Sequence, residues 1–255
     1  MLVVTGIGMR GAREEALLRR ATAFFGTAIP VEQHRYGVFR SGAIFRWCQR
    51  IATRRLAGRL RLPPDSSAGT PPDIVAHSFG AWLVGEALRQ NPDLRVGRLI
   101  LIGSVLPPDF DWGSLIRQGR VEAVLNHYGL RDRWVWASEY FIPSSGPSGL
   151  RGCAPCAGVV NRAEAAFRHT TFFDEPTIDT VYRELWQPFL TLPQAALDKL
   201  GNVSAPPQWK PAPWLLKANL PRAAFVLAGL AGGVALVLGV AWVLRWLVGV
   251  LWLSS

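Results

Sequence analysis

Residues 73–84 read DIVAHSFGAWLV and combine a strand signal, a tight turn and a helix signal. The apolar run 74–76 ends just before Ser78, and apolar residues at helical spacing follow that serine. Two small residues, Ala76 and Gly80, stand two positions before and after it. A sharp strand-to-helix turn strains the backbone of its apical residue and leaves room only for small neighbours. The stretch therefore predicts a serine hydroxyl raised above the edge of a sheet.

This pattern resembles the Gly-x-Ser-x-Gly turn of the α/β-hydrolase family, with Ala76 in place of the first glycine. One added methyl group is a mild departure, because the position requires a small residue rather than a positive φ. The resemblance covers about residues 1–195. It implies that Ser78 is a nucleophile and that an acid and a histidine follow it in the chain, in that order.

Six strand-length runs alternate with helical patterns along the first 200 residues, at 2–5, 31–36, 74–76, 98–103, 121–127 and 158–161. Strands separated by helices predict a parallel sheet that is covered on both faces. We therefore expect an α/β fold with a minimal α/β-hydrolase core, a mostly parallel sheet of about six strands. Ligands of such sheets bind at the carboxyl ends of the strands.

A serine hydroxyl is a poor nucleophile unless a base takes its proton and a third group orients that base. Of the four histidines, only His169 follows both Ser78 and a plausible acid with a strand between them. The resemblance places the histidine in a loop after the last strand, which fits residues 159–161 followed by His169. His77 is next to the serine in the chain, and this adjacency keeps its ring away from the serine oxygen.

The resemblance also implies an acid that holds the imidazole in the correct tautomer. Asp132 follows the strand that precedes the histidine's strand, where the family usually has its acid. Asp109 and Asp111, one strand earlier, remain alternatives.

Two backbone N–H groups are expected to hold the developing oxyanion. The family implies the amide of Phe79, directly after the nucleophile, and a second amide from the loop after the first strand. In this chain the second donor would be Ile7, with Gly8 as the fallback.

The composition changes after residue 200. Four prolines within residues 202–213 indicate an extended linker. Residues 223–244 carry no charge and, at about 1.5 Å per residue, would be roughly 33 Å long as a helix, enough to cross a bilayer core of about 30 Å. We predict a hydrolase-like domain over 1–200, a Pro-rich linker over 201–222 and a transmembrane tail over 223–253.

Lys210, Lys217 and Arg222 precede this tail and favour the cytoplasmic side for its beginning. The sequence thus predicts a single-pass C-terminal membrane anchor with the domain facing the cytoplasm. Gly229 and Gly233 have the spacing of a helix-pairing motif, so the tail could support a homodimer.

The chain has 28 Lys and Arg against 18 Asp and Glu, a formal net charge of +10. Residues 35–61 hold eight arginines and no acid, with apolar residues at helical spacing. A helix there would direct Arg46, Arg50 and Arg54 outwards in a row. Such a row could bind anionic lipid headgroups. The alternative is a solvent-exposed charged surface without a ligand. Nucleic acid is not expected as a partner, because no nucleic-acid-binding motif accompanies the charge.

Cys153 and Cys156 form an isolated C-x-x-C pair, and the third cysteine, Cys48, is distant in the chain. A structural zinc site needs four ligands. Because no metal-ligand cluster or nucleotide-binding glycine pattern is present in the sequence, no metal or cofactor is expected.

These observations predict a membrane-tethered serine hydrolase that cleaves a carboxylic ester or thioester through an acyl-serine intermediate. The tail and the arginine-rich stretch favour lipid or acylated-protein substrates. The alternative is a catalytically inactive hydrolase-like interaction module at the membrane, since a fold does not guarantee an activity.

Overall fold

The computed structural model describes residues 1–4, 15, 19–20, 22–23, 32–34, 45–61, 71–203, 210, 227–228, 230, 234 and 238–239. These residues form an α/β fold around one six-stranded sheet with the strand order β2-β1-β3-β4-β5-β6. Every neighbouring pair of strands is parallel. The strands are β1 (Leu2–Val4), β2 (Glu32–His34), β3 (Ile74–His77), β4 (Val96–Ile102), β5 (Val121–Gly129) and β6 (Val159–Glu164).

The predicted parallel sheet with covering helices is confirmed, and each of the six predicted strands overlaps one observed strand. The last two strands extend beyond their predicted ends. Tyr128 pairs with Ala163 and Gly129 with Glu164, so the ladder continues after the apolar pattern has stopped. Backbone pairing, rather than side-chain polarity, sets the ends of these strands.

Residues that alternate along the strands pack into two separate cores, one on each face of the sheet. In β3, Ile74 and Ala76 belong to the first core and Val75 to the second. This division follows from the two-residue period of a strand. Both cores are needed to bury a central parallel sheet, which is apolar on both faces.

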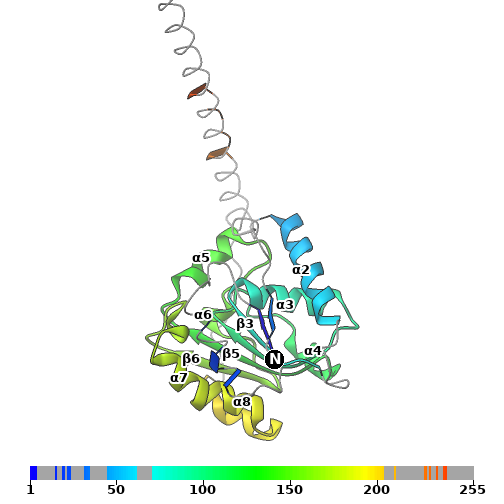
Figure 1. Cartoon of the computed structure of the whole chain (residues 1–255), viewed down its shortest axis with the longest axis vertical. Helices are drawn as coiled ribbons and strands as arrows, with labels where there is room; N and C mark the ends of the chain where they lie inside the picture. The colour runs from blue at the N-terminus through cyan, green and yellow to red at the C-terminus, as the bar shows by residue number, and fades with distance from the viewer. Residues whose placement is uncertain are drawn as a thin grey trace, which may run out of the picture.

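Helices from different parts of the chain cover the two faces (Figure 1). The first face carries α2 (Arg46–Arg61), α3 (Phe79–Gln90) and α4 (Trp112–Arg117). The second carries α7 (Thr177–Val181), the π-helical turn η3 (Tyr182–Trp186), α8 (Gln187–Thr191) and the 3₁₀ helix η4 (Gln194–Leu200). Between β5 and β6 lie α5 (Arg133–Phe141) and α6 (Ser148–Arg151), and the 3₁₀ turn η2 (Thr171–Phe173) follows β6.

Within the arginine-rich stretch, residues 46–61 form α2, as the apolar spacing predicted, and residues 35–44 lie outside the described residues. Its buried face includes Ala52 and Leu56, which pack in the first core. Arg46, Arg50 and Arg54 lie on the exposed face. The helix packs along α3, the helix that follows Ser78.

The predicted linker, 201–222, and the predicted tail, 223–253, lie almost entirely outside the described residues. Gly229 and Gly233 are also outside them. Within the part of the chain that the structure describes, no helix has both the length and the apolar character needed to span a membrane.

The strand order reverses between β1 and β3. From β1 the chain first adds β2 on one side, and it later adds β3 on the other side of β1. In open α/β sheets, ligands bind where the order reverses in this way, outside the carboxyl ends of the strands. Ser78 is the residue that directly follows β3 at this point.

Candidate active site

Ser78 stands in a strained turn between β3 and α3. Its φ of 56° and ψ of −124° lie outside the regions that a serine ordinarily adopts. The amide of Ser78 donates to the carbonyl of Ile102 at the end of β4 over 2.9 Å, and its own carbonyl accepts from Ala81 N–H over 3.0 Å. These two backbone bonds hold the residue in a conformation of the kind that clusters at active sites.

The structure brings Ser78, His169 and Asp132 into one hydrogen-bonded chain. Ser78 Oγ lies 3.0 Å from His169 Nε2, and His169 Nδ1 lies 2.6 Å from Asp132 Oδ2. Because an ionised carboxylate only accepts, the Nδ1–H donates to Asp132. The Nε2 lone pair is then free to accept the serine proton. The three residues follow β3, β5 and β6, so the sheet positions all of them.

Both oxygens of the Asp132 carboxylate are used. While Oδ2 faces His169, Oδ1 accepts from the backbone N–H groups of Trp134 and Val135, each over 3.0 Å. Asp132 is thus the N-cap of α5 and is almost fully buried. Its orientation toward the imidazole is set by the beginning of a helix.

The two alternative acids, Asp109 and Asp111, are not hydrogen-bonded to the imidazole of His169. Asp111 caps α4 by accepting from the amide of Ser114 over 2.9 Å. Asp109 is exposed. Among the described residues, only Asp132 of these three candidates has a hydrogen bond with His169.

Gly103 is a site residue that the sequence reasoning missed. It follows β4 with a φ of +51°, and a Cβ at this position would lie 3.1 Å from His169 Nδ1 and 3.2 Å from Asp132 Oδ2. A methyl group at this position would therefore press on both the imidazole and the carboxylate. The signal in the sequence was a glycine directly after the apolar run Leu99–Ile102, the clearest of the predicted strands.

His77 was also missed, because it was considered only as a base. Its ring lies 4.6 Å from the ring of His169, and its Nε2 lies 3.2 Å from the backbone oxygen of His169. Burial, followed by the charge of His169, lowers the pKa of His77 well below its usual value. The neutral ring donates its Nε2–H to that carbonyl, and its Nδ1 has no hydrogen-bond partner among the described residues.

The candidate oxyanion donors are only partly within the described chain. Phe79 is the first residue of α3, where helix N–H groups lack intrahelical acceptors and the helix dipole favours negative charge. Its ring stacks on Trp82, with 5.3 Å between the ring centroids. Ile7 and its fallback Gly8 lie outside the described residues.

The cysteine pair is far less reactive than its spacing could suggest. Cys153 and Cys156 are free thiols, and burial raises the pKa of Cys153 to about 12. The backbone of Cys153 is held on both sides by the side-chain amide of Asn161, over 2.8 and 2.9 Å. Within the described residues, no group of three or more His, Cys, Asp or Glu side chains could hold a metal ion.

No protein-family model matches this chain, and no curated protein sequence matches it. A buried carboxylate, an imidazole and a strained hydroxyl in line form an arrangement that can transfer a proton away from the hydroxyl as it attacks an electrophile.

Proposed function

We propose that this chain is a serine hydrolase of the α/β-hydrolase type, which cleaves a carboxylic ester or thioester. One observation carries the proposal: the line of hydrogen bonds from Ser78 through His169 to Asp132, with lengths of 3.0 and 2.6 Å. The parallel sheet and the position of Ser78 at the reversal of strand order are compatible with that family.

In the first half of the reaction, Ser78 Oγ attacks the acyl carbon while His169 Nε2 takes the hydroxyl proton. Asp132 stabilises the imidazolium that forms. The N–H of Phe79, together with Ile7 as the donor suggested by the sequence, holds the oxyanion of the tetrahedral intermediate. His169 then gives the proton to the leaving alkoxide or thiolate, and the acyl group stays on Ser78.

In the second half, water attacks the acyl-serine. His169 takes a proton from this water, and a second tetrahedral intermediate forms against the same N–H donors. When it collapses, the carboxylic acid leaves and His169 returns the proton to Ser78 Oγ.

The surface beside the site supports a substrate held in a membrane. α5, which is labelled in Figure 1, begins directly after Asp132. It exposes Trp134, Trp136 and Phe141, whose accessible fractions are 74, 54 and 49%. Tryptophan is enriched at membrane–water interfaces, where its ring is apolar and its N–H stays hydrated. Together with the membrane tail suggested by the sequence, this favours acyl lipids as substrates and a domain held at the cytoplasmic face of a membrane.

Labelling with a fluorophosphonate tests the assignment of the nucleophile. The full chain in membranes should react, Ser78→Ala should lose the label, and Ser114→Ala, on α4, should retain it. An unlabelled wild-type chain, or one whose label survives in Ser78→Ala, would instead favour the inactive module. The lipid assignment fails separately if vesicle-bound enzyme hydrolyses p-nitrophenyl butyrate but releases no fatty acid from the vesicle lipids.

A further inference from the structure

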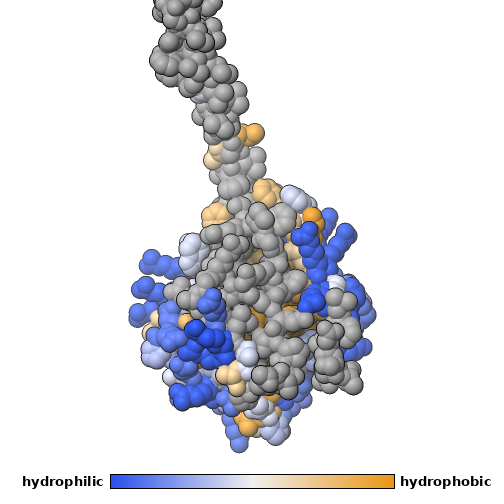
Figure 2. Space-filling model, in the orientation of Figure 1, coloured by the Kyte–Doolittle hydropathy of each residue, from blue (hydrophilic) through white to orange (hydrophobic). Residues whose placement is uncertain are grey.

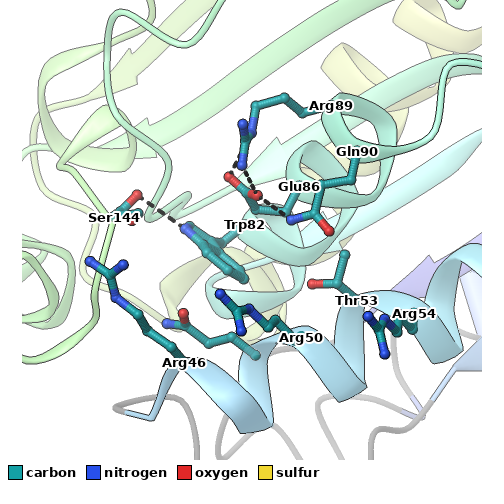
Figure 3. Close-up of a pocket in the computed structure, with 10 residues that line it drawn as sticks. Arg46, Arg50, Thr53, Arg54, Trp82, Glu86, Arg89, Gln90 and Ser144 are labelled. Atoms are coloured by element: carbon teal, nitrogen blue, oxygen red, sulfur yellow. Dashed lines mark hydrogen bonds and ion pairs between the residues drawn. The ribbon is translucent and has the colours of Figure 1, made fainter.

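We propose that the pocket between α2 and α3 is a binding site for a phosphate group with two negative charges. The pocket has a volume of about 300 Å³. The α2 side contributes Arg46, Arg50 and Arg54, and the α3 side contributes Trp82 and Glu86 (Figure 3). It is distinct from the hydrogen-bonded chain at Ser78.

The three arginines form one row along α2. Their spacing of four residues puts them on the same face of the helix, about 6 Å apart along its axis. All three are exposed, and their guanidinium groups have no ion pair or hydrogen bond with other described residues. Like charges at this spacing destabilise a helix. An anion in the pocket would offset that repulsion.

The one carboxylate in the pocket is already neutralised. Glu86 accepts from Arg89 over 2.7 and 3.1 Å and from the side-chain amide of Gln90 over 2.8 Å (Figure 3). It is therefore not a partner for the row on α2. The charges of Arg89 and Glu86 cancel, which leaves three positive charges in the lining.

Thr53 is a second, independent observation that points to a ligand in this pocket. It lines the pocket between the arginines, it is only 1% accessible, and its Oγ1 has no hydrogen-bond partner among the described residues. Buried polar atoms nearly always have a partner, from the protein or from something bound to it. A hydroxyl can donate to a phosphate oxygen.

The opposite wall of the pocket is rigid. Trp82 donates its Nε1–H to the carbonyl of Ser144 over 3.1 Å, and its ring stacks on Phe79. A fixed wall facing a row of guanidinium groups makes a defined site rather than a general charged surface. In Figure 2, hydrophilic residues, in blue, lie on the outer side of the domain where Figure 1 labels α2.

Phosphate is the anion that fits this set of groups best. The planar guanidinium fork binds phosphate oxygens in pairs. Three unpaired positive charges match a phosphomonoester dianion better than a single carboxylate. The same chemistry is offered by the headgroup of a phosphomonoester lipid and by a free phosphorylated molecule, and the two are separated by experiment. The inference does not depend on the proposed hydrolase, because binding can be measured without turnover.

The test uses the full chain in uncharged detergent micelles, with calorimetric titration at constant ionic strength. One arm adds inorganic phosphate, and the other adds dioctanoyl phosphatidic acid, with dioctanoyl phosphatidylcholine as its control. Binding of inorganic phosphate points to a free phosphorylated ligand. Binding of the phosphatidic acid alone points to a lipid headgroup, and either result supports the site.

Matched variants locate the binding. Replacing Arg46, Arg50 and Arg54 together by Gln should weaken binding by about tenfold or more, since it removes every unpaired charge in the pocket. Replacing three exposed arginines outside the pocket by Gln removes the same charge and should change the affinity less than about twofold; the three are Arg55, Arg95 and Arg151.

Thr53→Val distinguishes binding at a specific site from general electrostatic attraction to the arginines. It removes only the unpartnered hydroxyl, so binding should weaken about threefold or more while the melting temperature is unchanged or higher. Equal losses in the two triple variants would overturn the proposal. So would a wild-type chain that binds neither phosphate probe at concentrations up to about 10 mM.

Discussion

Asp132 and His169 are joined by a 2.6 Å contact between Oδ2 and Nδ1, and the other oxygen of the same carboxylate begins α5. The position of the imidazole and the start of the helix thus depend on one side chain. The helix that exposes Trp134 and Trp136 is for this reason attached directly to the candidate active site.

Replacing Asp132 in two ways should separate its two contacts. In Asp132→Asn the side-chain oxygen can still accept from the α5 amides, but an N–H now faces His169 Nδ1 and imposes the wrong tautomer. We expect kcat/KM for an ester substrate to fall by about 10³–10⁴-fold, with little change in melting temperature. Asp132→Ala should lose the cap as well, and its unfolding free energy should fall by a further 1–2 kcal/mol, approximately.

Urea denaturation measures the unfolding free energy of both variants, and ester hydrolysis measures their kcat/KM. Full activity in Asp132→Asn would remove Asp132 from the proposed mechanism. Equal stability of the two variants would show that the cap contributes nothing.

Gly103→Ala should damage the site more than it damages the fold. Gly103 and Gly119 both have a positive φ, +51° and +63°, so alanine costs each about 1–2 kcal/mol of stability. Only at Gly103 would the new methyl group press on His169 and Asp132, since nothing lies within 4 Å of a Cβ at Gly119. We expect about a hundredfold loss of kcat in Gly103→Ala alone. Similar activities in the two variants would refute this close approach.

The stability of the fold should fall below about pH 6.5, the usual pKa of histidine. Burial is the first cause that lowers the pKa of both His77 and His127, so the folded state keeps these rings neutral. Between the lowered pKa values and about 6.5 the unfolded chain binds more protons, and the unfolding free energy therefore decreases as the pH decreases.

Urea denaturation at pH 7.5 and 5.5 tests this pH dependence. His77→Gln, whose amide can still donate to the carbonyl of His169, should reduce the difference between the two pH values. His127→Gln should reduce it independently. If neither variant changes the difference, the two buried rings are not its source.

The Arg120 side chain should stabilise the folded state by binding backbone oxygens at the carboxyl end of α3. It is buried, and its guanidinium donates to the backbone oxygens of Leu88, Asn91 and Leu94. Arg120→Met would leave these carbonyls without their charged donor and should lower the unfolding free energy by about 2–4 kcal/mol. Arg95→Met, at an exposed arginine with one long contact to Pro92, should change it by less than about 0.5 kcal/mol. Thermal or urea unfolding distinguishes the two.

The local sequence pattern was sufficient to predict the turn around Ser78 and the strands of the sheet. The apolar run, the small neighbours and the helical spacing all act within about a dozen residues, and each restricts the backbone directly. The row of arginines on α2 was predictable for the same reason, because helical periodicity alone decides which residues share a face.

Which carboxylate meets His169 was decided only in three dimensions. Asp109, Asp111 and Asp132 all follow strands, and two of them cap helices, so their local sequences are nearly equivalent. The packing of the segment between β5 and β6 brings one of them to the imidazole. The requirement for glycine at position 103 also arises from the tertiary structure, because His169 and Asp132, which are distant in the chain, lie against it.

The sequence by itself therefore determined which stretches form strands, helices and the serine turn, because those depend on residues that are neighbours in the chain. The contact of His169 with Asp132 and the arginine pocket beside Thr53 depended on the tertiary structure. Both join residues from separate elements, and only the packing of those elements on the sheet fixes the distances between them.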